Sequence, residues 1–110
     1  VKSLVFRAEN DFLICLVAGD KRCSLNKLKK FLNKKDVSMA NADQVKENTG
    51  FSIGGVAPTG HLKKLNIIVD KSLSRFKYVY GAAGHPDCVF RITYPELVKL
   101  TIGSEQEIIE

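Results

Sequence analysis

Residues 2–17 read KSLVFRAENDFLICLV, which is two apolar segments separated by a polar turn. In the first segment, Leu4 and Phe6 alternate with other residues at the two-residue period of a strand. The second segment, Phe12–Val17, is apolar throughout, as in a strand that is buried on both faces. Residues 9–11 (Glu-Asn-Asp) suit the connection because Asn and Asp tolerate left-handed backbone. The stretch therefore predicts a β-hairpin within a sheet.

Helix caps and apolar periods place further elements after this hairpin. Ser24 can cap a helix to Asn33, and Thr93 with Glu96 forms the capping-box pattern of another helix start. The remaining expected elements are a strand at Asp36–Met39, a helix from Asn41 or Asp43 to Asn48 that stops at Gly50, and strands at Asn66–Asp70, Phe76–Tyr80 and Cys88–Ile92. The acidic tail Glu105–Glu110 is expected to fray or to pair with the basic body.

This order of elements predicts the fold class. Strands and helices interleave, but hairpins also occur, so we expect an α/β (α+β) domain with a mixed, twisted, partly barrel-like sheet and flanking helices. The length of 110 residues fits one domain spanning residues 1–110. The absence of an initiator Met indicates a trimmed chain or a fragment.

Composition narrows the class of protein. The chain is 45% hydrophobic and 26% charged, with a net charge of +5, which favours an anionic partner, nucleic acid ahead of membrane. No apolar run approaches the roughly 20 residues of a membrane-spanning helix, and no signal peptide is evident. Three cysteines without CxxC spacing argue against a disulfide framework and against zinc, and favour the reducing cytoplasm. Cys15, within an apolar run, is expected to be buried.

The usual catalytic motifs are missing from the sequence. There is no nucleophile elbow, HExxH pair, phosphate-binding loop or dinucleotide fingerprint. His61 and His85 both lie in Gly- or Pro-containing loops, and the simplest interpretation is that they are exposed. The residues alone therefore identify no catalytic triad, cofactor site or metal site.

The stretch FSIGGVAPTG, residues 51–60, is the most unusual part of the chain, and we call it the glycine-proline loop. Its glycines would let main-chain amides approach an anion or a developing oxyanion, and Pro58 would stiffen the loop. The alternative is a tight connection between two strands. Lys63 and Lys64 follow the loop as a possible phosphate-contacting patch, whereas the lysines between Lys27 and Lys35 fit a solvated helix face.

Taken in order, these segments resemble the YbaK/EbsC/ProX superfamily of aminoacyl-tRNA editing domains, which are free-standing or inserted in bacterial prolyl-tRNA synthetases. The resemblance rests on Val1–Val5, on the helix and strand of Leu25–Met39, and on Asp43–Phe51. It continues through Gly54–Gly60, where the chain reads GGVAPTG, through Ile67–Asp70, and through Gly84–Leu97.

The resemblance implies a hydrolase, without cofactor or metal, that removes an amino acid from the acceptor end of mischarged tRNA. It assigns catalysis to Lys2, which would stabilise negative charge, and to the main chain at Gly54 and Gly55. The implied substrate-binding residues are Ser3, Val56, Ala57, Pro58, Ala82, Gly84 and His85, and the implied tRNA-binding residues are Lys63 and Lys64. We expect the Lys2 ammonium to face the glycine-proline loop across a shared cleft.

Three departures from the family pattern shape the expected function. The chain begins almost at the lysine, without the N-terminal helical segment usual in the family, and carries Ser3 where relatives carry Asn or Thr. Ala82 and Val89 stand where cysteine-editing members carry Ser and Asp, which argues against a cysteinyl-tRNA substrate and leaves the choice of amino acid open. From the family we expect mischarged tRNA-Pro with a small amino acid. Prolyl-tRNA synthetase is then an expected partner. The alternative is an inactive module of this fold that binds tRNA or a synthetase.

Overall fold

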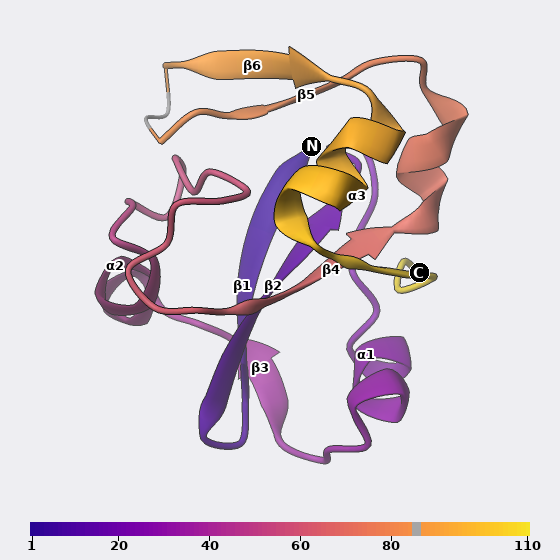
Figure 1. Ribbon diagram of the computed structural model, residues 1–110. Coiled ribbons are helices and arrows are strands. Elements are labelled where there is room, and N and C mark those ends of the chain that lie inside the picture. The colour runs from indigo at the N-terminus through magenta and orange to yellow at the C-terminus, as the bar shows by residue number, and fades with distance from the viewer. Residues whose placement is uncertain (85–86) are drawn as a thin grey trace.

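A computed structural model describes residues 1–84 and 87–110. The elements in chain order are β1 (Lys2–Ala8), β2 (Asp11–Val17), α1 (Leu25–Leu32), β3 (Val37–Met39), α2 (Ala42–Thr49), β4 (Asn66–Asp70), the 3₁₀ helix η1 (Lys71–Arg75), β5 (Val79–Ala82), β6 (Val89–Ile92), α3 (Tyr94–Thr101) and β7 (Ser104–Gln106). Figure 1 shows a twisted sheet with helices around it and a separate two-stranded ribbon across one end. This arrangement confirms the predicted mixed α+β class.

The predicted hairpin is confirmed and lies inside the main sheet. The strand order is β3-β1-β2-β4-β7, with β1 antiparallel to β2 and β3, β2 parallel to β4, and β4 parallel to β7. Strand pairing leaves β3 and β7 at the edges, so this sheet is open and does not close into a barrel. The ribbon of β5 and β6 pairs separately. Because β2 is central, its apolar run is buried on both faces.

Apolar side chains on the two faces of the sheet form two cores. On one face, Val5 and Ile14 pack with α2 and α3, with the connection formed by residues 51–65, and with the β5–β6 ribbon. On the other face, Phe6 and Cys15 pack with α1 and the C-terminal segment. Alternation along β1 therefore sends odd-numbered side chains to the first face and even-numbered side chains to the second.

The helix boundaries follow the predicted caps. The Ser24 hydroxyl accepts a hydrogen bond from the Lys27 amide, and α1 ends at Asn33 in the left-handed conformation. Capping boxes begin α2 at Asn41 and α3 at Thr93. In the described part of the chain, no helix is long and apolar enough to cross a membrane.

Two expected elements differ from the structure. The segment after β4 forms η1, which begins where the Asp70 carboxylate accepts a hydrogen bond from the Ser72 amide, and β5 then starts at Val79 rather than Phe76. The acidic tail does not fray: β7 pairs with β4, and Ile108 is buried and donates its amide to Asp70. One tail residue also joins the basic body, since Glu107 lies 3.9 Å from the Lys27 ammonium.

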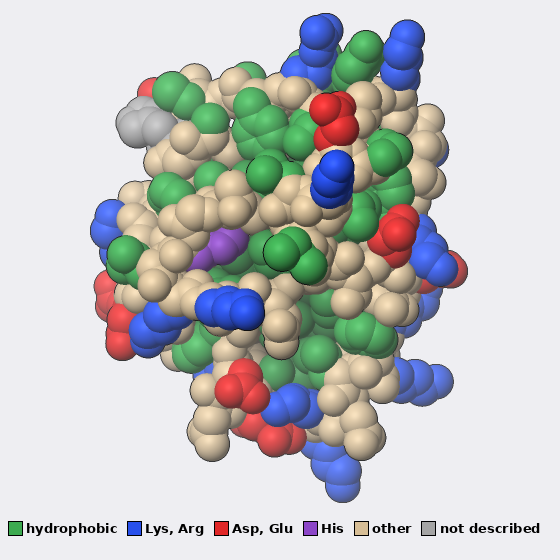
Figure 2. All heavy atoms as spheres, viewed as in Figure 1, with side chains coloured by type: hydrophobic (Ala, Val, Ile, Leu, Met, Phe, Trp, Pro, Cys, Tyr) green, Lys and Arg blue, Asp and Glu red, His purple; other side chains and the backbone are tan. Residues whose placement is uncertain are grey.

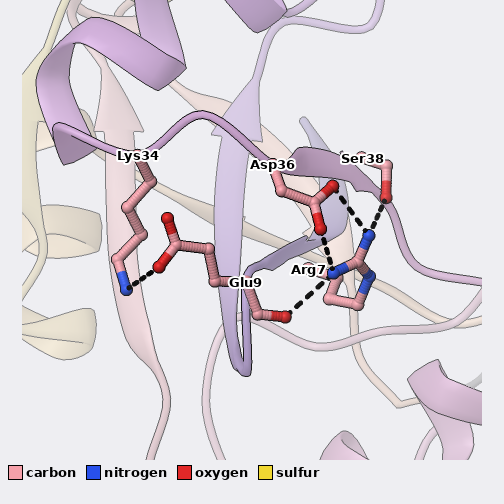
Figure 3. A network of polar contacts seen from close by, with 5 residues as sticks. All are labelled: Arg7, Glu9, Lys34, Asp36 and Ser38. Carbon is pink, nitrogen blue, oxygen red and sulfur yellow. Dashed lines mark hydrogen bonds and ion pairs between the residues drawn. The ribbon is translucent and has the colours of Figure 1, made fainter.

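A polar network fixes the tip of the hairpin to β3 (Figure 3). Arg7 donates two hydrogen bonds to the Asp36 carboxylate, at 3.0 and 3.1 Å, and one to the Ser38 hydroxyl. Lys34 lies 4.0 Å from the Glu9 carboxylate. The Arg7 guanidinium holds the pKa of Asp36 below its usual range.

Candidate functional site

A narrow crevice lies where β1 begins, between the main sheet and the β5–β6 ribbon. Its walls are packed so closely that no water-sized sphere fits between them. Its lining includes Ser3, Pro58, Val79, Gly81, Phe90 and Ile92. Two of the predicted substrate-binding residues, Ser3 and Pro58, thus meet at one closed and mostly apolar crevice.

The ribbon supplies the outer wall of this crevice. Gly81 lies directly opposite Phe90 in the β5–β6 ladder. A β-carbon at Gly81 would lie 3.0 Å from the Phe90 ring, so the absence of a side chain lets the ring lie across the strand. The sequence did not mark Val79 or Phe90 as site residues, because each reads only as a strand residue.

The glycine-proline loop forms the opposite wall with its C-terminal half. Val56 and Pro58 are buried, and Val56 belongs to the core below the crevice. The Gly55 amide donates a 2.8 Å hydrogen bond to the Ser52 carbonyl, which closes a turn. In the structure described, this amide is therefore used within the loop, and its predicted catalytic role stays a prediction. Gly54, at the tip of the turn, is exposed.

His61 fixes the path of this loop. Its Nε2 atom lies 2.7 Å from the Ala57 carbonyl oxygen, and its ring meets Phe51 edge-on with centroids 6.0 Å apart. His61 is only partly exposed, in contrast to the exposed loop histidine that the sequence favoured. A hydrogen bond to an oxygen four residues earlier leaves no periodic pattern from which the sequence could predict it.

The two remaining described candidates border the ribbon's turn. Ala82 ends β5 opposite Val89. Gly84 has φ +93°, and a β-carbon there would lie 3.2 Å from the Phe51 ring, so Gly84 lies close against the start of the glycine-proline loop. His85 lies outside the described residues.

Lys2 does not take the predicted position. Its ammonium donates a 2.6 Å hydrogen bond to the Lys21 carbonyl, in the segment that follows β2. Lys2 has the parity of Leu4 and Phe6, whereas Ser3 has the parity that faces the crevice. The Lys2 ammonium and the glycine-proline loop therefore lie at the same end of β1 but on opposite faces of the sheet.

Lys63 and Lys64 line a second and much larger depression, the basic groove, with a volume of about 1080 Å³. The groove also contains His61 and Lys34, which pairs with Asp11 of the same lining at 3.1 Å. Thr59 and Gly60 carry the glycine-proline loop into it. Lys63 and Lys64 are both exposed. Figure 2 shows the mixed character of one face, with Lys and Arg side chains around apolar ones.

The described residues offer limited metal or redox chemistry. No group of three or more described His, Cys, Asp or Glu side chains could hold a metal ion. Cys15 is buried, as expected, and hydrogen bonding between Cys15 and Cys23 raises the pKa of the former thiol and lowers that of the latter. Both thiols lie on the face of the sheet away from the crevice.

The profile of the aminoacyl-tRNA editing domain matches residues 1–100, which includes both walls of the crevice. The chain belongs to the aminoacyl-tRNA editing domain family. This editing domain is 37% identical over 103 residues to the uncharacterized protein YwhH of Bacillus subtilis, covering 93% of the chain and 65% of YwhH. It is also 37% identical over 82 residues to the proline–tRNA ligase of Thermosipho africanus, covering 74% of the chain and 14% of the ligase.

The fold of the editing domain agrees with a solved relative. A crystal structure of a candidate trans-editing enzyme for prolyl tRNA synthetase superposes with a TM-score of 0.95 at 37% identity, covering all of this chain and 69% of the other. The editing domain thus spans 65% of YwhH and about one seventh of the ligase.

Proposed function

We propose that this editing domain hydrolyses the ester bond of mischarged aminoacyl-tRNA, and that its substrate is tRNA-Pro carrying a small amino acid. The family match supports the reaction class. The proline–tRNA ligase and the candidate trans-editing enzyme for prolyl tRNA synthetase support the tRNA and a prolyl-tRNA synthetase as partner. Such editing acts in the cytoplasm, where tRNA is charged.

The meeting of Ser3 and Pro58 at one crevice is the observation that carries this proposal. Its walls leave no space for a water molecule in the structure described, so binding would require them to part. Because Pro58 and the apolar strand residues around it are closely packed, we expect the opened crevice to admit a small side chain and exclude larger ones. Hydrolytic sieving by size supplies the discrimination that binding of similar apolar side chains cannot.

Lys2 remains our proposed charge-stabilising residue, with one added step. Its hydrogen bond to Lys21 joins a cation to a neutral carbonyl, and an anionic phosphate is a stronger acceptor. In the proposed mechanism the long, flexible side chain exchanges this carbonyl for the anionic 3′ end of the tRNA. A water molecule then attacks the ester, whose aminoacyl group lies near Ser3, Ala57 and Pro58.

The basic groove is proposed to hold the tRNA backbone beside the crevice. Lys63 and Lys64 are exposed there, and the glycine-proline loop runs from the crevice into the groove. Contacts between lysines and phosphates make binding dependent on salt concentration. Replacing both lysines by Ala should weaken tRNA binding and reduce its salt dependence.

A specific observation favours the alternative of a binding module without turnover. Lys2 is held at Lys21, and the Gly55 amide is used in a turn, so the two predicted catalytic groups do not converge. Such a module would bind tRNA with a steep salt dependence and release no amino acid.

The deciding experiment measures deacylation of a panel of mischarged tRNAs. We expect hydrolysis of tRNA-Pro that carries a small amino acid, and a loss of about 100-fold or more in Lys2→Ala. Lys30→Ala removes an equally charged, exposed residue of α1 and should retain wild-type activity. Equal hydrolysis by wild type and Lys2→Ala would exclude Lys2 from the mechanism. Tight tRNA binding without hydrolysis of any substrate would support the binding module instead.

A further inference from the structure

The outer face of the β5–β6 ribbon carries a surface that the editing reaction does not use. Tyr80 lies opposite Arg91, and these positions alternate with Gly81 and Phe90, which line the crevice. One face of the ribbon is therefore the crevice wall, and the other faces outward. We call the outward surface, made of Lys77, Tyr78, Tyr80 and Arg91, the ribbon platform.

Both aromatic rings of the platform are exposed, and Tyr78 is stacked with two cations. Tyr80 is 55% exposed and Tyr78 is 39% exposed. The Arg91 guanidinium lies 4.6 Å from the centroid of the Tyr78 ring, and the Lys77 ammonium lies 5.5 Å from the same centroid. Arg91 also lies opposite Tyr80 in the ladder, so its backbone position neighbours Tyr80 while its guanidinium stacks on Tyr78.

The charge of this surface is positive. Among the described ion pairs, none joins Lys77 or Arg91 to a carboxylate, whereas nearby Arg75 pairs with Asp20 at 2.8 Å. Asp87, in the turn of the ribbon, has a polar interaction of its own. Figure 2 shows basic and apolar side chains projecting together at the top of the view, where Figure 1 draws the ribbon.

We propose that the ribbon platform binds single-stranded RNA by stacking a base on exposed Tyr80, while Arg91 and Lys77, which lie over Tyr78, contact the phosphates. Aromatic rings interleaved with cations are the combination that binds single strands, because every base has a stacking face. A duplex offers no such faces along its length. RNA is favoured over a protein partner because Lys77 and Arg91 lie outside the described ion pairs, and their charge complements a phosphate backbone.

The inference rests on the proposed function for the identity of the strand, which is the unpaired 3′ end of tRNA. The platform and the crevice are the two faces of one ribbon. A strand stacked on the outer face would need to pass only the ribbon's edge to bring its terminal nucleotide to the crevice. The platform would then hold the nucleotides that precede the reacting ester.

The test measures the affinity of a fluorescein-labelled RNA of ~8 nucleotides ending in CCA by fluorescence anisotropy. Tyr80→Leu keeps an apolar side chain but removes the ring, and we expect it to weaken binding by about fivefold or more. Tyr80→Phe keeps the ring and should stay within about twofold of wild type. Arg91→Gln should weaken binding and reduce the magnitude of the salt slope by about 0.7.

Two controls separate this proposal from other outcomes. Lys30→Ala, on α1, should leave the affinity unchanged, and a blunt RNA duplex should bind with an affinity insensitive to Tyr80→Leu. An unchanged affinity in Tyr80→Leu, or equal losses for single strand and duplex, would overturn the platform. Deacylation is measured in parallel: failure of hydrolysis with intact, Tyr80-dependent oligonucleotide binding counts against the proposed function only.

Discussion

His61 Nε2 lies 2.7 Å from the carbonyl oxygen of Ala57, so one side chain closes the last turn of the glycine-proline loop. The neighbouring residue Pro58 is a wall of the crevice. The loop therefore depends on a hydrogen bond made from outside the crevice, which gives the first prediction.

Replacing His61 by Phe should loosen the loop without unfolding the domain. The ring would keep its packing against Phe51 but lose the hydrogen bond, which contributes about 0.5–1.5 kcal/mol. We expect faster amide hydrogen exchange across residues 51–60 and a raised KM for deacylation. His61→Gln can still donate a hydrogen bond to the Ala57 carbonyl, so hydrogen exchange and KM should return part of the way to wild-type values. Unchanged exchange in His61→Phe would show that packing alone holds the loop.

Gly81→Ala should reshape the crevice through Phe90. The new β-carbon would meet the Phe90 ring at 3.0 Å, so the ring must move, at a cost of about 1–3 kcal/mol in unfolding free energy. We expect deacylation of the small aminoacyl substrate to fall by about tenfold or more. Gly19→Ala is the matched control, because nothing lies within 4 Å of a β-carbon there. Equal effects of the two substitutions on activity would show that Phe90 has no part in substrate recognition.

Ile108→Ala should destabilise the domain by about 2–5 kcal/mol, because the side chain is 1% exposed in the core that α1 and the C-terminal segment share. Ile102→Ala, at a residue that is 92% exposed, should change the unfolding free energy by less than about 0.5 kcal/mol. Urea denaturation measures both values. A small effect at Ile108 would indicate that the tail is dispensable in solution.

The Arg7–Asp36 pair predicts a pH dependence of stability. Arg7 lowers the pKa of Asp36 from its ordinary value of 3.8, so the pair stabilises the fold above that pH, and this contribution is lost as the pH falls through the lowered pKa. In Arg7→Met the decline in unfolding free energy below pH 4 should therefore be shallower. The effect should shrink in high salt because the pair is exposed. Arg22→Met, which replaces an exposed arginine outside the described ion pairs, should retain the wild-type slope; a wild-type slope in Arg7→Met would contradict the assignment.

Cys23 should react with iodoacetamide at a lower pH than an ordinary thiol. Hydrogen bonding with Cys15 lowers its pKa by favouring the thiolate. Cys15→Ala removes this partner, so the midpoint of the alkylation rate against pH should rise. Peptide mass spectrometry separates modification of Cys23 from that of exposed Cys88. An unchanged midpoint in Cys15→Ala would show that the two thiols are independent.

Local signals in the sequence predicted most of the fold. The caps Ser24, Asn41 and Thr93 depend on residues three positions away, and the hairpin of β1 and β2 depends on a short turn. The pairing of β7 with β4 was missed because it joins residues over thirty positions apart and the segment is acidic. The start of β5 was misplaced because pairing with the four-residue β6, rather than the aromatic residues before Val79, sets the strand's extent.

The candidate site was predictable in outline but not in orientation. Family motifs identified Ser3 and Pro58, which share the crevice. The direction of Lys2 could not be predicted, because both faces of β1 carry apolar residues and either parity could have faced the crevice. The hydrogen-bond partner of the Gly55 amide depends on the type of turn that the loop adopts. The composition of the loop does not determine that turn type.

The pairing of Tyr80 with Arg91 and of Gly81 with Phe90 means that adjacent residues of the ribbon serve separate surfaces. Inserting or deleting a single residue in either strand would exchange the inward and outward sets, while a two-residue change would restore them. The ribbon should therefore tolerate length variation among relatives only in even steps or within its turn, so that ladder register itself constrains how the editing domain can diverge.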